Sequence, residues 1–117
     1  MPLPKLYCDM DGVLCDFKSQ AEKVVGVPIN KWMALSKIDK WKPIVDKKDF
    51  WSTLPWMTGG KQLWSYIKKH NPDILSAHVE EIRDPTCIAG KLLWAKRNLG
   101  LPNNRINLVK FFRSACK

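Results

Sequence analysis

Two carboxylates, Asp9 and Asp11, stand one residue apart directly after the apolar run 6–8 and just before Gly12. Two carboxylates this close repel each other, so they favour a site that also holds a cation. Oxygen ligands suit Mg²⁺, which proteins bind through one or two carboxylates together with substrate phosphate oxygens. A carboxylate can also attack phosphorus as a covalent nucleophile, and a second one can act as general acid and base. Asp9 and Asp11 are therefore candidates for phosphoryl transfer, and the alternative is a solvated acidic turn, the commoner meaning of a bare Asp-x-Asp.

The segments around this pair predict a strand, an acidic loop and a helix. The run 6–8 has the apolar character of a short buried strand, and Gly12 permits a sharp turn after it. Asp16 is placed to cap a helix whose apolar positions are Phe17, Ala21, Val24 and Val25. The carboxylates would then lie at the carboxyl end of a strand, where open α/β sheets bind their ligands.

A second strand is expected over 73–78, and it carries Ser76 and Ala77 close to its carboxyl end. A hydroxyl and neighbouring backbone N–H groups at this place can hold a phosphate oxygen, although a serine after a strand is more often a simple turn residue. Asp84 and Pro85 have the positions of N-cap and first residue of a helix over 84–99, with a third strand at 105–109. The order of elements predicts an α/β fold with a parallel sheet. The expected inward face of that helix comprises Ile88, Leu92, Ala95 and Leu99.

The segment 28–58 is unusually rich in aromatic residues. We expect a short helix over 31–37, no clear pattern over 38–49, and a helix over 61–70 that buries Leu63, Trp64 and Ile67. Aromatic side chains usually belong to the core, but here they could also form a helical cap whose faces stack on a base or ribose. The aromatic residues of the segment are Trp32, Trp41, Phe50, Trp51 and Trp56.

The run 9–14, Asp-Met-Asp-Gly-Val-Leu, resembles motif I of the haloacid dehalogenase superfamily of phosphotransferases. Its place directly after an expected strand near the N-terminus is also similar to that of motif I. The following Asp16-Phe17 and the tryptophan-rich middle are most similar to the 5'(3')-deoxyribonucleotidase branch, including its short phage-type members. This resemblance implies a Rossmann-like parallel sheet with a small helical cap, at about 18–58, inserted after the first strand.

The resemblance also implies an activity: Mg²⁺-dependent hydrolysis of a nucleoside monophosphate, either ribo- or deoxyribo-. Asp9 would be the nucleophile and Asp11 the acid and base, with Mg²⁺ held by the Asp9 carboxylate and the Asp11 main-chain carbonyl. Ser76 matches motif II by its order in the chain, so Ser76 and Ala77 would bind phosphate. The cap would contribute Phe17, Phe50 and Trp51 to the substrate pocket.

Motif III of this superfamily is a basic residue that neutralises the nucleophile and the phosphate. We expect it just past the third strand, where the candidates are Lys110 and Lys117, with Arg113 as a further possibility. A basic surface tail is the alternative. Acidic residues that match motif IV are absent after the third strand, so the resemblance implies a single incomplete domain over 1–117 that lacks the final strands. The first strand would then be an exposed sheet edge through which the chain could self-associate.

Composition limits the remaining classes of function. The chain has 117 residues, enough for one domain, and a net charge of +9, which attracts anions such as nucleotides. Four cysteines without a C-x-x-C pair and only two histidines argue against a zinc site. The sequence has no membrane-spanning run and no signal-peptide pattern, so we expect a cytoplasmic protein, in the host cytoplasm if a phage encodes it. Two alternatives to the phosphatase stay open: a non-catalytic remnant of such an enzyme, and a small basic nucleic-acid-binding protein.

Overall fold

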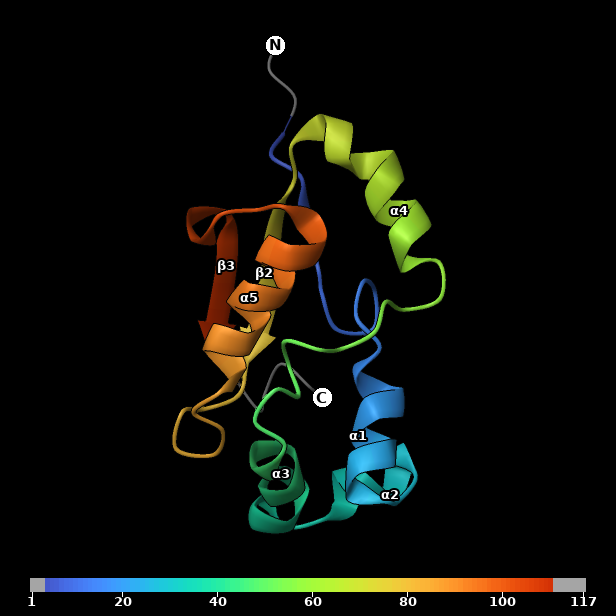
Figure 1. The fold of residues 1–117 in the computed structure, drawn as a ribbon, viewed down its shortest axis with the longest axis vertical. Coiled ribbons are helices and arrows are strands. Elements are labelled where there is room, and N and C mark those ends of the chain that lie inside the picture. The colour runs from blue at the N-terminus through green and yellow to red at the C-terminus, as the bar shows by residue number, and fades with distance from the viewer. Residues whose placement is uncertain (1–3, 111–117) are drawn as a thin grey trace.

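The computed structural model describes residues 4–110 and has an α/β fold (Figure 1). It measures 48 × 26 × 25 Å, and a sheet with its helices occupies one end of the long axis. The elements in chain order are β1 (Tyr7–Cys8), α1 (Phe17–Val25), α2 (Ile29–Ala34), α3 (Lys37–Asp46), α4 (Gly60–Ile67), the 3₁₀ turn η1 (Lys68–His70), β2 (Asp73–His78), α5 (Cys87–Leu99), the 3₁₀ turn η2 (Asn103–Arg105) and β3 (Ile106–Lys110).

The three strands form a parallel sheet in the order β1-β2-β3. This arrangement confirms the predicted α/β class and is compatible with a Rossmann-like fold. Helix α5 packs against the face of the sheet that carries Ile74 and Ser76, whose side chains are buried (Figure 1). On the opposite face, Tyr7, Leu75 and Val109 are between 42% and 50% exposed, so this face is open to solvent at all three strands.

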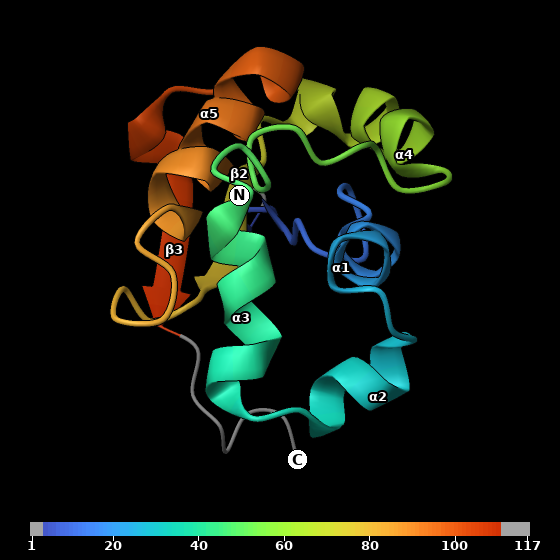
Figure 2. The ribbon, with the colours of Figure 1, turned by 60° about the horizontal axis from the view of Figure 1, so that its bottom comes forward.

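Helices α1, α2 and α3 gather at the end of the molecule toward which the strands point, and we call them the helical body (Figures 1 and 2). Asp16 caps α1 as predicted, since its carboxylate accepts a hydrogen bond from the Ser19 N–H at 3.1 Å. Gly26 ends this helix in the left-handed conformation, with φ of 86°, which favours glycine. Ser36 caps α3 in the same way as Asp16 caps α1, by accepting from the Asp39 N–H.

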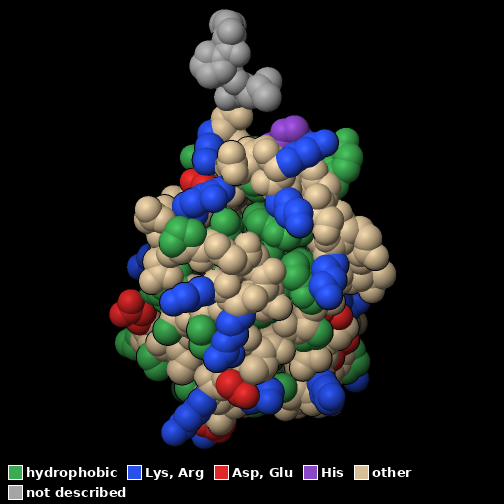
Figure 3. All heavy atoms as spheres, turned by 45° about the horizontal axis from the view of Figure 1, so that its top comes forward, with side chains coloured by type: hydrophobic (Ala, Val, Ile, Leu, Met, Phe, Trp, Pro, Cys, Tyr) green, Lys and Arg blue, Asp and Glu red, His purple; other side chains and the backbone are tan. Residues whose placement is uncertain are grey.

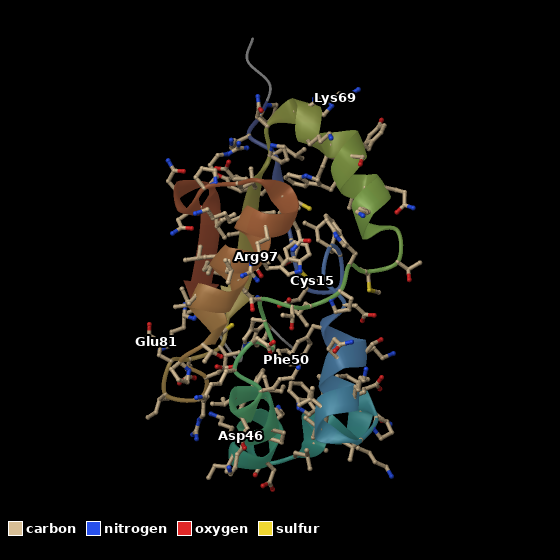
Figure 4. The ribbon with its side chains drawn as sticks, in the orientation of Figure 1. Cys15, Asp46, Phe50, Lys69, Glu81 and Arg97 are labelled. Atoms are coloured by element: carbon tan, nitrogen blue, oxygen red, sulfur yellow. The ribbon has the colours of Figure 1, made fainter. Side chains whose placement is uncertain are left out.

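The core joins the helical body to the sheet. Phe50 lies between the two parts in Figure 4 and is 1% exposed. The buried apolar residues form one cluster, which comprises Cys8, Met10, Leu14, Cys15, Ala21, Trp32, Ile44, Phe50, Trp51, Leu54, Trp64, Ile74, Cys87, Trp94, Ala95, Leu101 and Ile106. A single core is therefore shared by the two parts of the structure.

Several predicted elements differ from those observed. Helix α3 was not expected, because Pro43 inside it obscures the helical pattern. Helix α5 begins at Cys87 rather than at the Asp84-Pro85 pair, because the Asp84 side chain turns into the protein and Thr86 takes the N-cap position. Helix α4 buries Trp64 as expected, but Leu63 is 38% exposed. Within residues 4–110, no helix is both long and apolar enough to cross a membrane.

The inward face of α5 also differs from the expected one. The buried positions are Cys87, Lys91, Trp94 and Ala95, whereas Leu92 and Leu99 are only partly buried. A lysine thus occupies a core position on this helix. Through its contact with Asp11, Lys91 adds a basic side chain to the site described in the next subsection.

Candidate functional site

The acidic turn at the end of β1 is held in shape by its own backbone. The Met10 carbonyl oxygen accepts from the N–H groups of Val13, Leu14 and Cys15, and Gly12 adopts φ of 78° to close the turn. The segment after the helical body braces this turn, because the Met57 N–H donates to the Leu14 carbonyl at 2.7 Å. The position of the two carboxylates is therefore fixed by backbone contacts on both sides.

Lys91 brings the acidic turn and the end of β2 together. Its ammonium donates to the Asp11 carboxylate at 2.7 Å, to the Ser76 hydroxyl at 2.9 Å and to the Ala77 carbonyl oxygen at 2.6 Å. The Lys91 side chain is 1% exposed and the Asp11 side chain 33% exposed. A buried ammonium needs such partners, because an unpaired buried charge is strongly unfavourable. One cation thus joins the acidic turn, which was expected to carry the catalytic residues, to the end of β2, which was expected to bind phosphate.

The two carboxylates have different surroundings. Asp9 is open to solvent, and its Oδ1 accepts from the Met10 N–H at 2.7 Å. Partial burial is the main cause that raises the pKa of Asp9, and the Asp11 charge acts in the same direction. In Asp11, Oδ2 receives the Lys91 ammonium, whereas Oδ1 is buried and has no hydrogen-bond partner within residues 4–110. An orphaned buried oxygen is costly, which indicates that a ligand or water completes this site.

A pocket of about 370 Å³ opens over these groups. Its floor includes Asp9, Asp11 and the end of β2, which contributes Ser76 and Ala77. Its walls come mainly from the helical body and from the segment that follows β2. The other lining residues are Phe17, Trp32, Met33, Lys40, Trp41, Trp51, His78, Val79 and Glu80. The volume and the aromatic wall suit a small organic molecule with a flat apolar part.

The aromatic wall is a packed set rather than separate rings. Phe17 and Trp51 are stacked, with ring centroids 5.3 Å apart and planes 8° apart. Trp32 meets Trp41 edge to face at 5.1 Å. Phe50, the third predicted pocket residue, lies behind this wall and contacts both Phe17 and Trp51, but it does not line the pocket. Phe50 thus supports the wall from the core.

Lys110, the one candidate for the basic residue that the structure describes, does not belong to the group around Lys91, Asp11 and Ser76. Lys110 ends β3 with an exposed side chain, and its register partner is His78 on the neighbouring strand. Lys117 and Arg113 lie outside the described residues. Within residues 4–110, Lys91 is the basic residue that contacts Asp11 and Ser76, and we did not predict it. The available signal was its spacing of i, i+4 and i+7 with Cys87 and Trp94, which places a lysine among core positions.

His78 lines the pocket, and its ring nitrogen Nδ1 lies 3.0 Å from the Val79 carbonyl oxygen. The described cysteines show no sign of catalytic activation. Burial raises the pKa of Cys87 to about 11, and it raises those of Cys8 and Cys15 as well, so these thiols stay protonated near neutral pH.

The donor set at the acidic turn fits a magnesium ion that shares its ligands with substrate and water. Within the described part of the chain, no three or more Asp, Glu, His or Cys side chains come together as a metal site. Asp9 has an accessible carboxylate, whereas one oxygen of Asp11 is taken by Lys91. Mg²⁺ commonly uses one or two protein carboxylates and completes its octahedron with phosphate oxygens and water. Binding in the absence of a phosphate ligand should accordingly be weak.

Comparison with known proteins gives no family assignment: no protein-family model matches the chain, and a search of curated proteins found no significant match.

Proposed function

We propose that this protein is a Mg²⁺-dependent phosphomonoester hydrolase of the haloacid dehalogenase type, acting on nucleoside monophosphates. The observation that carries this proposal is the Lys91 ammonium, which is buried and bridges the Asp11 carboxylate and the Ser76 hydroxyl beside Asp9. A buried cation next to two carboxylates and a hydroxyl forms an anion site that already contains a nucleophile. Phosphoryl transfer needs this combination of positioning and charge neutralisation.

In the proposed reaction, Asp9 attacks phosphorus through a carboxylate oxygen, and the bond to the ester oxygen of the substrate breaks. Asp11 enters this step protonated and donates its proton to that leaving oxygen, which departs as the nucleoside hydroxyl and leaves Asp11 as a carboxylate. A water molecule then attacks the aspartyl phosphate on Asp9, and the Asp11 carboxylate takes its proton. Phosphate leaves, Asp9 is again a free carboxylate, and Asp11 again carries the proton with which the cycle began.

Three other residues of the chain would hold the phosphoryl group. Lys91 and the Ser76 hydroxyl lie beside the acidic turn, and the ammonium, whose three N–H groups are held by Asp11, Ser76 and Ala77, would exchange one of these partners for an equatorial oxygen. The Ala77 carbonyl oxygen receives a hydrogen bond from Lys91, so Ala77 would also orient the ammonium. When bound, Mg²⁺ would supply further neutralisation of the phosphate charge, with the Asp9 carboxylate and the Asp11 carbonyl as its ligands.

The aromatic wall supports a nucleoside as the leaving group. Trp32, Trp41 and the stacked Phe17–Trp51 pair line the pocket beyond the acidic turn. Stacking of a base on an aromatic side chain contributes about 1–3 kcal/mol. The helical body would then be the cap of this enzyme type, with Lys40 of α3 as an additional cation in the pocket.

Turnover of nucleoside monophosphates with and without Mg²⁺ tests this proposal. Wild-type protein should release phosphate, EDTA should abolish the release reversibly, and Asp9→Asn should remove it. After acid quenching, phosphate should be found covalently attached at residue 9. The matched control is Asp46→Asn, because Asp46 is an exposed carboxylate of α3 that pairs with Lys42 on the surface. Wild-type turnover in Asp9→Asn would refute the assignment of the nucleophile.

A second candidate, nucleic-acid binding, rests on the net charge of +9. Figure 3 shows one face of the molecule on which lysine and arginine side chains are scattered among apolar and polar ones. Binding to DNA or RNA whose affinity falls steeply with salt, in a protein without phosphate release, would favour this candidate.

A further inference from the structure

Asp84 is a buried carboxylate that the proposed reaction does not use. It lies in the segment between β2 and α5, is 1% exposed, and its Oδ2 accepts from the Trp51 indole Nε1–H at 2.7 Å. Its Oδ1 accepts from both the backbone N–H and the hydroxyl of Thr86. A carboxylate removed from water in this way is stabilised only by the donors that face it. The hydrogen bond to Trp51 is therefore strong, and it joins segments that are 33 positions apart in the chain.

The ring that Asp84 holds lies over Lys91. The Lys91 ammonium is 5.2 Å from the Trp51 ring centroid, a distance at which a cation is attracted to the aromatic face. Trp51 also stacks on Phe17 of α1. Gly90, next to Lys91 on α5, allows this approach, since a β-carbon at residue 90 would lie 2.5 Å from the Trp51 Cβ. The indole thus fits between the helical body and α5 with little freedom.

We propose that Asp84 is a positioning residue that acts through Trp51 on Lys91. By fixing the indole Nε1–H, Asp84 keeps the aromatic face over the ammonium and keeps water away from it, so Lys91 is held toward Asp11 and Ser76. The inference rests on the proposed function only for the role of the Lys91 ammonium, which would be to neutralise the phosphoryl group. The contacts between Asp84, Trp51 and Lys91 exist whether or not the protein hydrolyses phosphate esters.

A chemical-labelling experiment tests the positioning without any need for activity. Folded protein is treated with a limiting amount of an amine-acylating reagent, and the modification of each lysine is followed by mass spectrometry. In the wild type, Lys91 should be among the slowest lysines to react. In Asp84→Asn and Trp51→Phe, which weaken or remove the hydrogen bond, acylation of Lys91 should be roughly tenfold faster, because a hydrogen bond to a charged group no longer opposes local opening.

Trp94→Phe is the matched control. The Trp94 indole donates to the Leu54 carbonyl oxygen at 2.7 Å and is 1% exposed, so its loss removes a buried indole hydrogen bond one turn along α5 from Lys91 that involves neither Asp84 nor Trp51. Trp94→Phe should therefore leave the labelling of Lys91 unchanged after correction for any change in global stability. An equal increase in Trp94→Phe would show that Lys91 reports general loosening, which would overturn the proposal.

The same variants, measured by kcat and KM for a nucleoside monophosphate, test the link to function. If Asp84 acts through Trp51, the double variant Asp84→Asn/Trp51→Phe should be no slower than the slower single variant. Fully additive losses, or an Asp84→Asn protein with wild-type labelling and kcat, would refute the inference. If the wild type shows no turnover but the labelling pattern holds, the proposed function fails and the positioning inference stands. Should Asp84→Asn not fold, Trp51→Phe alone against Trp94→Phe still decides the outcome.

Discussion

Replacing Lys91 with methionine tests how strongly the buried ammonium supports the site. Methionine has similar length and fills most of the same space, so the main loss is polar. Three acceptors at 2.6 to 2.9 Å lose their common donor. An unsatisfied buried acceptor costs about 1–3 kcal/mol, but Asp11 is one-third exposed and water can reach it. Relief of the desolvation of Lys91 offsets part of the loss. We expect Lys91→Met to lower the free energy of unfolding by about 2–3 kcal/mol.

Urea unfolding followed by circular dichroism measures this change. For a domain of this size the slope is about 1–3 kcal/mol per molar urea, so the midpoint should fall by roughly 1–2 M at an unchanged slope. Lys96→Met is the control, because Lys96 is exposed on the same helix and its change should stay within about 0.5 kcal/mol. The double variant Lys91→Met/Asp11→Asn should recover part of the loss, since the uncompensated carboxylate is gone. Equal midpoints for Lys91→Met and Lys96→Met would refute the importance of the network.

Three further predictions follow from the site and the sheet. Partial burial raises the pKa of Asp9, so in Mg²⁺-free protein the Asp9 carboxylate, followed by NMR, should titrate above the ordinary carboxylate value of 3.8; titration at or below 3.8 would contradict this expectation. A β-carbon at residue 90 would lie 2.5 Å from the Trp51 Cβ, so Gly90→Ala should displace Trp51 and lower the melting temperature measured by calorimetry by several degrees. An unchanged melting temperature would mean that Trp51 moves aside at little cost. The open sheet face and the edge strand β1 should promote self-association, measurable by light scattering at increasing protein concentration, and Tyr7→Lys should reduce it; monodisperse wild-type protein would argue against this.

The parts of the structure that could be predicted are those in which the signal is local. The strand over 73–78 and the helix capped by Asp16 were confirmed, because an apolar run and a cap-forming side chain act within a few residues. Helix α3 was missed because Pro43 weakens its pattern, although Ser36 and Asp39 form the capping pair that begins it. For α3, the Ser36 cap was a local signal for a helix, whereas Pro43 was a local signal against one.

The basic residue of the site could not be found by position along the chain. We looked for it after the third strand, whereas Lys91 reaches the acidic turn from the middle of α5. Its spacing with Cys87 and Trp94 indicates a buried position, but it does not indicate that the partner is Asp11, which tertiary packing places there. The role of Asp84 could not be predicted either. Its sequence context indicates a helix cap, whereas its Oδ2 accepts a hydrogen bond from the Trp51 indole, 33 positions away. Buried polar contacts between distant segments are the features that local patterns do not encode.

The bond between Asp11 and Lys91 joins positions 80 residues apart, which has a consequence for how the protein is made. On the ribosome, the acidic turn emerges early, and its two neighbouring carboxylates have no ammonium to face until α5 has been synthesised. β1 and β2 can pair before that time, yet Asp11 would still lack its cation. A nascent chain or a proteolytic fragment that stops ahead of α5 would therefore hold both strands but leave the two carboxylates without an ammonium. Loss of α5 by local unfolding would likewise remove the ammonium from the acidic turn before the sheet separates.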